Sequence, residues 1–320
     1  MNRRSAALAL AALSAGPSLA LGEWPARTIT LVVPFAPGGI ADLTARSVGE
    51  AMAPSLGQTI LIDNRPSAGS VVGSAAVARA PADGYTLLLM SNANAVSTGL
   101  FRKLPFDVVR DFAPITTLGY FDLGVFVASS SRLRSIGDLI GEAKAKPGRL
   151  TIGTISIGST QHLAAELFKT KAGIDAVIVP YKATPAVLTA LRSGEIDVGF
   201  EILGPMLPQV VAKAVRLVAV TSDTRYPRLP DVPTVSEAGA PGYAVASWNA
   251  LAAPTGTPPE VIDRLNAAAR SALAQEGVQR RFLELGVRPQ ASSPRELETL
   301  LAGEIRRWRD VIRTANIQQQ

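Results

Sequence analysis

The part of this sequence best suited to chemistry is an apolar strand that runs directly into a glycine-rich helix start. It spans Thr28–Arg46, TITLVVPFAPGGIADLTAR, where a β-branched run is followed by Pro37, Gly38 and Gly39 and then by an amphipathic helical pattern. Glycines at a helix start let an oxyanion approach free backbone N–H groups and the positive end of the macrodipole. The alternative is an ordinary strand–helix turn whose glycines serve chain geometry alone.

A second junction of the same kind follows later in the chain. A strand-like run over Leu150–Ile155 leads to the small-residue turn Gly158, Ser159, Thr160 and then to a helical pattern over Gln161–Lys171. One hydroxyl can cap this helix, which leaves the other hydroxyl and nearby N–H groups available to a ligand oxygen. Since open α/β sheets bind ligands at the carboxyl ends of their strands, we expect the two junctions to face each other across a cleft. This arrangement suits a dicarboxylate or a similar anionic metabolite.

Polar side chains at three other strand ends are weaker candidates. Ser91 and Asn92 end one strand-like run, and Tyr181, followed by Lys182, ends another. The tyrosine fits somewhat better in a core beside a solvated lysine. Glu201 lies at the end of a third run, where its carboxylate repels an anion unless it is protonated, paired or in contact with an ammonium or hydroxyl group.

The residues that usually carry catalysis are scarce. Ser156 lies in a segment similar to a nucleophile elbow without its first glycine, but the single histidine, His162, follows only six residues later. His162 fits better as a residue that packs or caps a helix. One histidine and no cysteine argue against a metal site, and no dinucleotide fingerprint occurs at a strand–helix turn. We expect no catalytic residue, no metal and no cofactor, with a serine hydrolase using Ser156 as the enzyme alternative.

The first twenty residues have the features of a secretory signal peptide. Arg3 and Arg4 precede an apolar run too short to span a membrane, and Ser18, Leu19 and Ala20 form a small-x-small cleavage site. Cleavage after Ala20 would leave 320 − 20 = 300 residues, enough for two domains, with a scattered net charge of 30 − 26 = +4. We therefore expect a periplasmic protein with an anionic small-molecule ligand and no nucleic-acid partner.

Strand-like and helical runs alternate along the rest of the chain, which predicts parallel sheets with helices on both faces. The strand-like runs are 28–34, 59–63, 86–91, 124–128, 150–155, 176–180, 197–202 and 215–221. The helical runs are 41–53, 71–80, 136–145, 160–172, 185–193, 206–212, 258–275, 278–285 and 294–315, with Thr184 as the expected N-cap before Pro185. Residues 118–127 and 244–253 are the expected crossings between two lobes.

Motifs along the whole chain after the leader resemble the Bug-type, TctC-like family, the substrate-binding proteins of tripartite tricarboxylate transport systems. In order, they are Pro34–Asp42, Asp63–Pro66 with Ala68 and Gly69, Asp83–Leu87, Leu104–Asp107 with Asp111 and Phe112, Gly158 and Ser159 with His162 and Leu163, Val179–Lys182, Ala219–Ser222, Pro230–Thr234 with Glu237–Gly239, Ala253 and Pro254, Thr257 and Pro258, Glu304 and Trp308. Their number and order make the resemblance specific.

The resemblance implies an α/β, type II periplasmic-binding-protein fold, with two doubly wound lobes, a hinge, and a cleft that closes on ligand. We place residues 1–20 in the signal peptide, 21–121 and 250–320 in lobe 1, and 122–249 in lobe 2. It further implies that the loops at 37–39 and 158–160 hold a carboxylate, partly through water. Family members deliver carboxylates, amino acids or aromatic acids to a membrane permease, and some serve signalling, so a ligand sensor is the second alternative.

The ligand itself does not follow from the resemblance. The family often has Asp and then Asn where this chain has Glu201 and Ile202, and a glycine where Ser70 stands. We expect a monomer that binds a small organic anion. The candidate ligand-binding residues are Phe35, Pro37, Gly38, Gly39, Asp42, Ser91, Asn92, Gly158, Ser159, Thr160, His162, Tyr181 and Glu201, and one of Phe35, Tyr181 and Trp248 could stack on a ligand ring.

Overall fold

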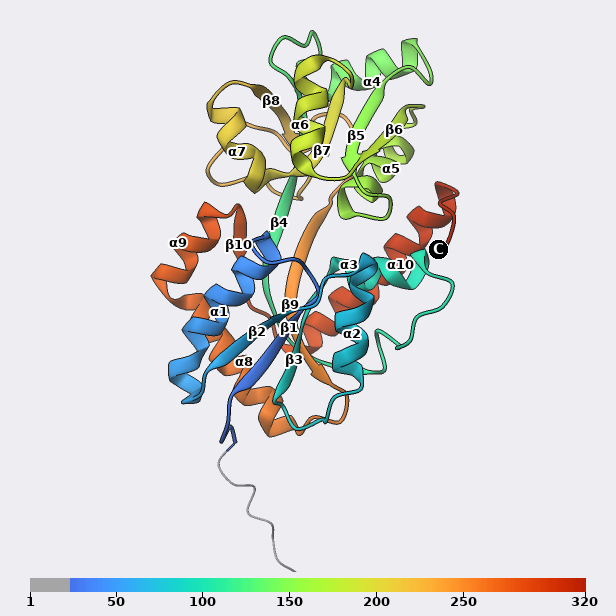
Figure 1. Ribbon diagram of the computed structural model, residues 1–320. Helices are drawn as coiled ribbons and strands as arrows, with labels where there is room; N and C mark the ends of the chain where they lie inside the picture. The colour runs from blue at the N-terminus through green and yellow to red at the C-terminus, as the bar shows by residue number, and fades with distance from the viewer. Residues whose placement is uncertain (1–23) are drawn as a thin grey trace, which may run out of the picture.

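Two lobes are joined by two long strands that run between them (Figure 1). The computed structural model describes residues 24–320, so the predicted signal peptide lies outside the described residues. The connecting strands are β4 (Phe112–Ala128) and β9 (Ala246–Pro254), which pair with each other in antiparallel fashion. Both predicted crossings, 118–127 and 244–253, are confirmed.

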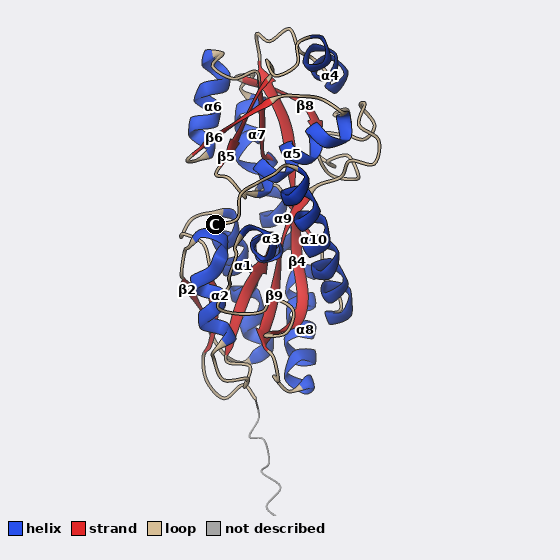
Figure 2. Ribbon diagram, turned by 90° about the vertical axis from the view of Figure 1, so that its right-hand side faces the viewer, coloured by secondary structure: helices blue, strands red, loops and turns tan. Residues whose placement is uncertain are grey.

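The first lobe combines the N-terminal and C-terminal parts of the chain. Its sheet has the order β2 (Ile60–Asn64), β1 (Ile29–Val33), β3 (Thr86–Ser91), β9 and β4, with the short β10 (Val287–Pro289) also on β4. Its helices are α1 (Ile40–Leu56), α2 (Val71–Ala78), α3 (Asn92–Leu100), α8 (Pro259–Ala274), α9 (Glu276–Glu284) and α10 (Pro294–Thr314), with a 3₁₀ turn at Ala68–Ser70. Figure 2 shows that helices cover both faces of this sheet.

The second lobe is built from the middle of the chain. Its strands are β5 (Thr151–Ile155), β6 (Val177–Tyr181), β7 (Val198–Ile202) and β8 (Val215–Val220), together with the far end of β4. Its helices are α4 (Ile136–Ala145), α5 (Thr160–Ala172), α6 (Thr184–Ser193) and α7 (Leu203–Val211). β6, β5 and β7 are parallel, as the βαβ alternation predicts.

β4 belongs to both lobes. It pairs with β9 as far as Asp122, and from Leu123 onward it pairs with β7 and β8. All of these pairings are antiparallel, and so is that of β3 with β9, whereas the sequence predicted parallel sheets only. A strand that carries the chain out of one lobe and a strand that brings it back must run in opposite directions, which explains the mixed sheet. We propose that the hinge lies where β4 changes partners.

The predicted elements are present, and the structure adds β10 and the 3₁₀ turn at Ala68–Ser70, which were not predicted. β3, α4 and α5 begin and end at the predicted residues, but β4 is much longer than the predicted 124–128. α3 was not predicted, and it begins with a capping box in which Ser91 accepts from the Ala93 N–H and donates its own N–H to Asn94. The prediction that Thr184 caps α6 was wrong, because Ala183 is the N-cap and Thr184 is the first helical residue.

No helix within residues 24–320 is long and apolar enough to cross a membrane.

Candidate functional site

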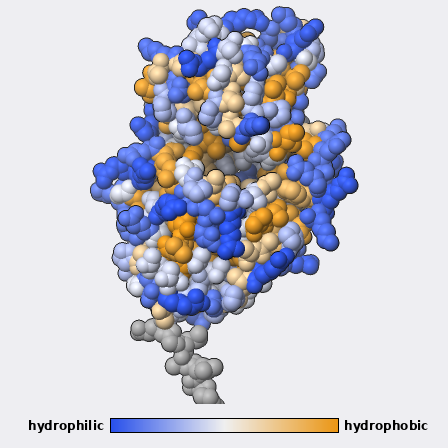
Figure 3. All heavy atoms as spheres, in the orientation of Figure 1, coloured by the Kyte–Doolittle hydropathy of each residue, from blue (hydrophilic) through white to orange (hydrophobic). Residues whose placement is uncertain are grey.

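A cleft of about 660 Å³ lies between the two lobes, and Figure 3 shows the surface hollowed there with apolar residues around the opening. Both lobes and both connecting strands contribute to its walls. The residues that line it are Phe35, Ala36, Pro37, Gly38, Gly39, Ile40, Ala41, Ser91, Ala93, Val96, Phe121, Ile155, Gly158, Ser159, Thr160, Gln161, Thr184, Ile202, Pro205, Ser247 and Asn249. No charged side chain is among these lining residues of the described chain.

The loop before α1 forms one wall of the cleft. Gly38 adopts a left-handed φ of 82°, which favours glycine, and its N–H donates to Asp42 Oδ2 at 2.8 Å. Gly39 is the N-cap of α1 and has no side chain to occupy the first turn. Within residues 24–320, the N–H groups of Ile40 and Ala41 donate to no protein acceptor, so they are free to bind a ligand.

Asp42 supports this loop from behind and does not line the cleft. It is buried, and besides the Gly38 N–H it accepts from Arg46 Nε at 3.0 Å and Asn64 Nδ2 at 2.9 Å. Burial raises the pKa of Asp42, but the hydrogen bonds from Arg46, Gly38 and Asn64 outweigh it and lower the pKa below its ordinary value. The carboxylate therefore stays charged and holds the turn in place.

The loop before α5 forms the facing wall in the second lobe. Ser159 is the N-cap: its hydroxyl accepts from the His162 N–H at 3.1 Å and donates to the Ile155 carbonyl at 3.0 Å. Thr160 keeps its hydroxyl hydrogen, since its Oγ1 only accepts, from Asn92 Nδ2 at 2.9 Å. The N–H groups of Thr160 and Gln161 have no protein acceptor among the described residues. As the sequence predicted, one of the two hydroxyls, that of Ser159, caps the helix, and the other, that of Thr160, keeps its hydrogen.

Asn249 adds a donor on β9 that sequence reasoning missed. Its side chain is buried and lines the cleft, and its Nδ2 has no hydrogen-bond partner within the described residues. It lies opposite Ser91 in the β3–β9 register. A buried amide without a partner costs stability, so this one is best explained by a ligand or water acceptor. The only sequence signal was a polar residue within an otherwise mostly apolar crossing strand.

Glu201 lies behind the wall of the second lobe and is fully buried. Its Oε2 accepts from Thr184 Oγ1 at 2.9 Å and from Gln161 Nε2 at 3.3 Å, and both of these partners line the cleft. Burial raises the pKa of Glu201 to about 7, although the bonds from Thr184 and Gln161 partly oppose the shift. Ile202, the next residue on β7, faces the cleft instead, because neighbouring side chains of a strand point to opposite faces.

His162 and Tyr181 also lie away from the cleft lining. His162 is buried on the inner face of α5, and burial lowers the pKa of its imidazole. Tyr181 donates its hydroxyl to Glu195 Oε1 at 2.7 Å, and burial together with that hydrogen bond raises the pKa of Tyr181 to about 12. Ser156 is exposed, and among the described residues no hydrogen bond joins its hydroxyl to His162.

Asn92 bridges the two lobes rather than lining the cleft. While its Nδ2 donates to Thr160 of the second lobe, its Oδ1 accepts from Trp308 Nε1 at 2.7 Å in the first lobe. Trp308 Nε1 also lies 2.7 Å from Glu304 Oε2. The start of α5 is thereby linked to α10 through a fully buried amide.

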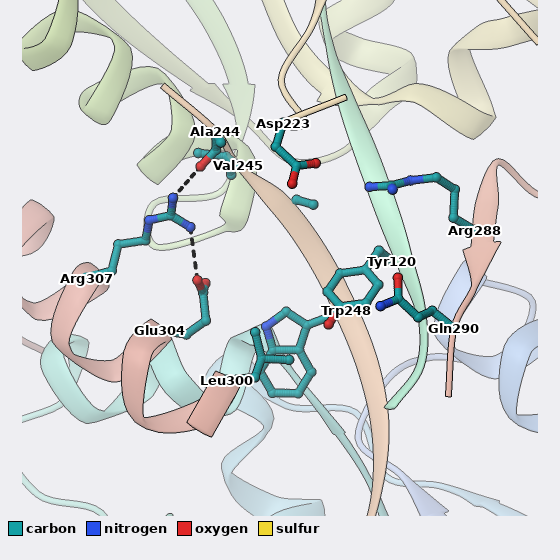
Figure 4. A pocket seen from close by; sticks show the side chains of 11 residues that line it. Tyr120, Asp223, Ala244, Val245, Trp248, Arg288, Gln290, Leu300, Glu304 and Arg307 are labelled. Atoms are coloured by element: carbon teal, nitrogen blue, oxygen red, sulfur yellow. Dashed lines mark hydrogen bonds and ion pairs between the residues drawn. The ribbon is translucent and has the colours of Figure 1, made fainter. Parts of the chain in front are cut away.

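The series of hydrogen bonds from Asn92 through Trp308 to Glu304 continues to Arg307, on the far side of the connecting strands. Arg307 donates to Glu304 Oε1 at 2.9 Å and also to the Ala244 carbonyl just before β9 (Figure 4). These groups line a second cavity of about 360 Å³ that also includes Tyr120 and Trp248. α10 is thus bonded to the segment that leads into β9 and, through Asn92, to the start of α5.

Comparison with known proteins places this fold and cleft in a family. The model of the TctC family, described as "Tripartite tricarboxylate transporter family receptor", matches residues 44–317. The chain belongs to this family. Members are extracytoplasmic solute-binding receptors with a two-lobe fold, and the chain is a receptor of this kind rather than an enzyme.

Three similar proteins illustrate the family. Protein BugT of Bordetella pertussis is 34% identical over 292 residues, which cover 91% of this chain and 90% of BugT. The structure of R. palustris Rpa4515 with adipate has a TM-score of 0.81 and 35% identity, covering 93% of this chain and 100% of that one. MatC from Rhodopseudomonas palustris with bound malate has a TM-score of 0.76 and 32% identity, covering 90% and 99%. The resemblance to Bug-type receptors is confirmed.

Proposed function

We propose that this protein captures a small carboxylate in the cleft between its lobes and delivers it to the permease of a tripartite tricarboxylate system. The observation that carries the proposal is the pair of helix starts, α1 in one lobe and α5 in the other, whose free N–H groups belong to residues lining one cleft. Free N–H groups and helix dipoles attract an anion without a cationic side chain. This way of binding an anion agrees with the lining of the cleft, which within the described chain contains no Lys, Arg or His.

The rest of the lining favours a ligand with an apolar body. Phe35, Ile40, Val96, Phe121 and Ile155 surround the polar groups with hydrocarbon. Burying such surface contributes roughly 25 cal/mol per Å², so a short hydrocarbon chain adds to the affinity supplied by its carboxylate. Adipate, bound by Rpa4515, combines a hydrocarbon chain with carboxylates, and malate, bound by MatC, is a second carboxylate to test.

Ligand contact with both lobes would stabilise a closed arrangement. The lobes already meet beside the cleft: Asn92 bonds to Thr160, and a Cβ on Gly158 would overlap Leu100 of the other lobe. A bound carboxylate adds further bonds across the same boundary. The permease can then distinguish the loaded receptor from the empty one by the relative position of the lobes.

The test is a calorimetric titration of the purified receptor at pH 7 with adipate and malate, and with their diamides as uncharged counterparts. We expect at least one acid to bind, and to bind at least a hundredfold more tightly than its diamide. Equal affinities for acid and amide, or no binding by either acid, would contradict the proposal. Delivery is tested separately by deleting the gene, which should lower cellular uptake of the acid that binds.

A further inference from the structure

The wall formed by Gln161 and Thr184 differs chemically from the helix starts beside it. A hydroxyl has one hydrogen, and Thr184 directs that hydrogen to Glu201 Oε2 at 2.9 Å. The oxygen of Thr184 that remains available to the cleft is therefore only an acceptor. The N–H groups at the start of α5 are, in contrast, only donors.

The same carboxyl oxygen also fixes the orientation of the Gln161 side-chain amide. Its Nε2 lies 3.3 Å from Glu201 Oε2, which turns the amide nitrogen toward the buried carboxyl group. Its Oε1 accepts no hydrogen bond from the residues that the structure describes, and the side chain lines the cleft. When Glu201 is ionised, its Oε2 can only accept, and this fixes Thr184 and Gln161 as the donors toward it.

We infer that the ligand carries a hydrogen-bond donor, a hydroxyl or an ammonium group, in addition to its carboxylate, and that Thr184 and Gln161 bind this donor. The inference rests on the proposed carboxylate site, because it assigns the second functional group of the same ligand. Glu201 acts as a positioning residue that keeps the two acceptors turned toward the cleft.

The alternative occupant of this wall, a second ionised carboxylate, fits poorly. Carboxylate oxygens only accept hydrogen bonds, so they would face the Thr184 and Gln161 oxygens without a proton between them. Among the described residues, no cationic side chain lines the cleft to offset the repulsion, and Glu201 lies directly behind the wall. A hydroxyl or an ammonium group satisfies both acceptors, and an ammonium group is further attracted by Glu201 when that residue is ionised.

The test compares acids that differ by one donor group. Butanoate and hexanoate are titrated calorimetrically at pH 7 beside their 2-hydroxy, 3-hydroxy, terminal hydroxy and terminal amino derivatives. We expect at least one derivative to bind about tenfold or more tightly than its parent acid, since a site built for a hydrogen bond discriminates against the analogue that lacks it. The hydroxy and amino arms separate the two kinds of donor.

Thr184→Val removes the acceptor without changing the size of the side chain. The ratio of the derivative's affinity to that of its parent acid should fall from about tenfold to threefold or less, because the derivative's donor loses its acceptor. Thr189→Val is the matched control on the same helix, because Thr189 is exposed and donates to the Pro185 carbonyl away from the lining residues. It should leave the preference unchanged.

The outcomes separate this inference from the function on which it rests. Parents and derivatives that bind equally well, or a preference that survives in Thr184→Val, would overturn the donor site and leave the carboxylate site standing. If none of these acids nor adipate or malate binds, the proposed function fails and the donor site fails with it.

Discussion

A carboxylate placed at residue 39 should abolish anion binding and leave the fold intact. Gly39 has φ −78° and ψ 168°, which any residue adopts, and a Cβ there would meet only the Ala36 carbonyl oxygen, at 3.7 Å. Aspartate is also a favoured N-cap residue, so Gly39→Asp should keep or raise the stability of α1. The new charge would lie among the residues that line the cleft.

The size of the effect follows from the position of Gly39 in the lining. A ligand carboxylate about 5 Å from the new carboxylate, at an effective dielectric constant of about 20, is repelled by about 3 kcal/mol. The aspartate oxygen would in addition compete for the free N–H groups of the first turn. Together these effects should weaken binding more than a hundredfold.

This prediction is checked by calorimetry with whichever of the tested acids binds the parent protein most tightly, and by a thermal melt of the same sample. The matched control is Gly277→Asp, which adds the same charge to the first turn of α9, where a new Cβ meets no atom within 4 Å. The control should bind as the parent protein does. Binding of that acid by Gly39→Asp at undiminished affinity, or an equal loss in both variants, would refute the assignment of an anion site to the start of α1.

Three further predictions test groups around the cleft. Burial raises the pKa of Glu201 from 4.5 to about 7, so its contribution to stability is complete below pH 4.5 and is lost as the pH rises through 7. The free energy of unfolding in urea should therefore fall by about 3 kcal/mol between pH 4 and pH 8, and Glu201→Gln should remove this decline. A parallel decline in both proteins would contradict that pKa. Gly204→Ala should weaken binding of the same acid about tenfold and enlarge the ligand-bound receptor in small-angle scattering, because a Cβ on Gly204 overlaps the Leu285 carbonyl of the other lobe. An unchanged scattering profile would count against closure at this contact. Tyr181→Phe should leave the affinity for that acid within twofold, since the hydroxyl bonds to Glu195, and a larger loss would indicate that Tyr181 contacts the ligand.

Much of the fold follows from local sequence patterns, and the exceptions have physical causes. α5 begins after its N-cap, Ser159, and ends at its left-handed C-cap, Gly173, so the helix was predictable from its own residues. α3 was not, because its sequence, NANAVSTGL, contains residues of low helix propensity and the helix depends on packing against α10. The length of β4 depends on partners in both lobes that no local pattern shows.

The candidate site was predictable where chain geometry decides it and not where side-chain direction does. The glycine turns at Gly38 and Gly158 line the cleft because strand ends and helix starts meet there. Glu201 and Tyr181 were placed near the cleft by the same reasoning, but strand alternation turns them to other partners. Asn249 could be located only once the β3–β9 register was known.

A crystal structure of the complex would show whether helix starts from both lobes hold one carboxylate ligand. The protein would be crystallised with whichever of adipate, malate or a hydroxy acid binds most tightly. We expect ligand carboxylate oxygens within hydrogen-bond distance of the N–H groups of Ile40 or Ala41 in one lobe and of Thr160 or Gln161 in the other, directly or through one water. A ligand bound outside the cleft, or held by only one lobe, would contradict it.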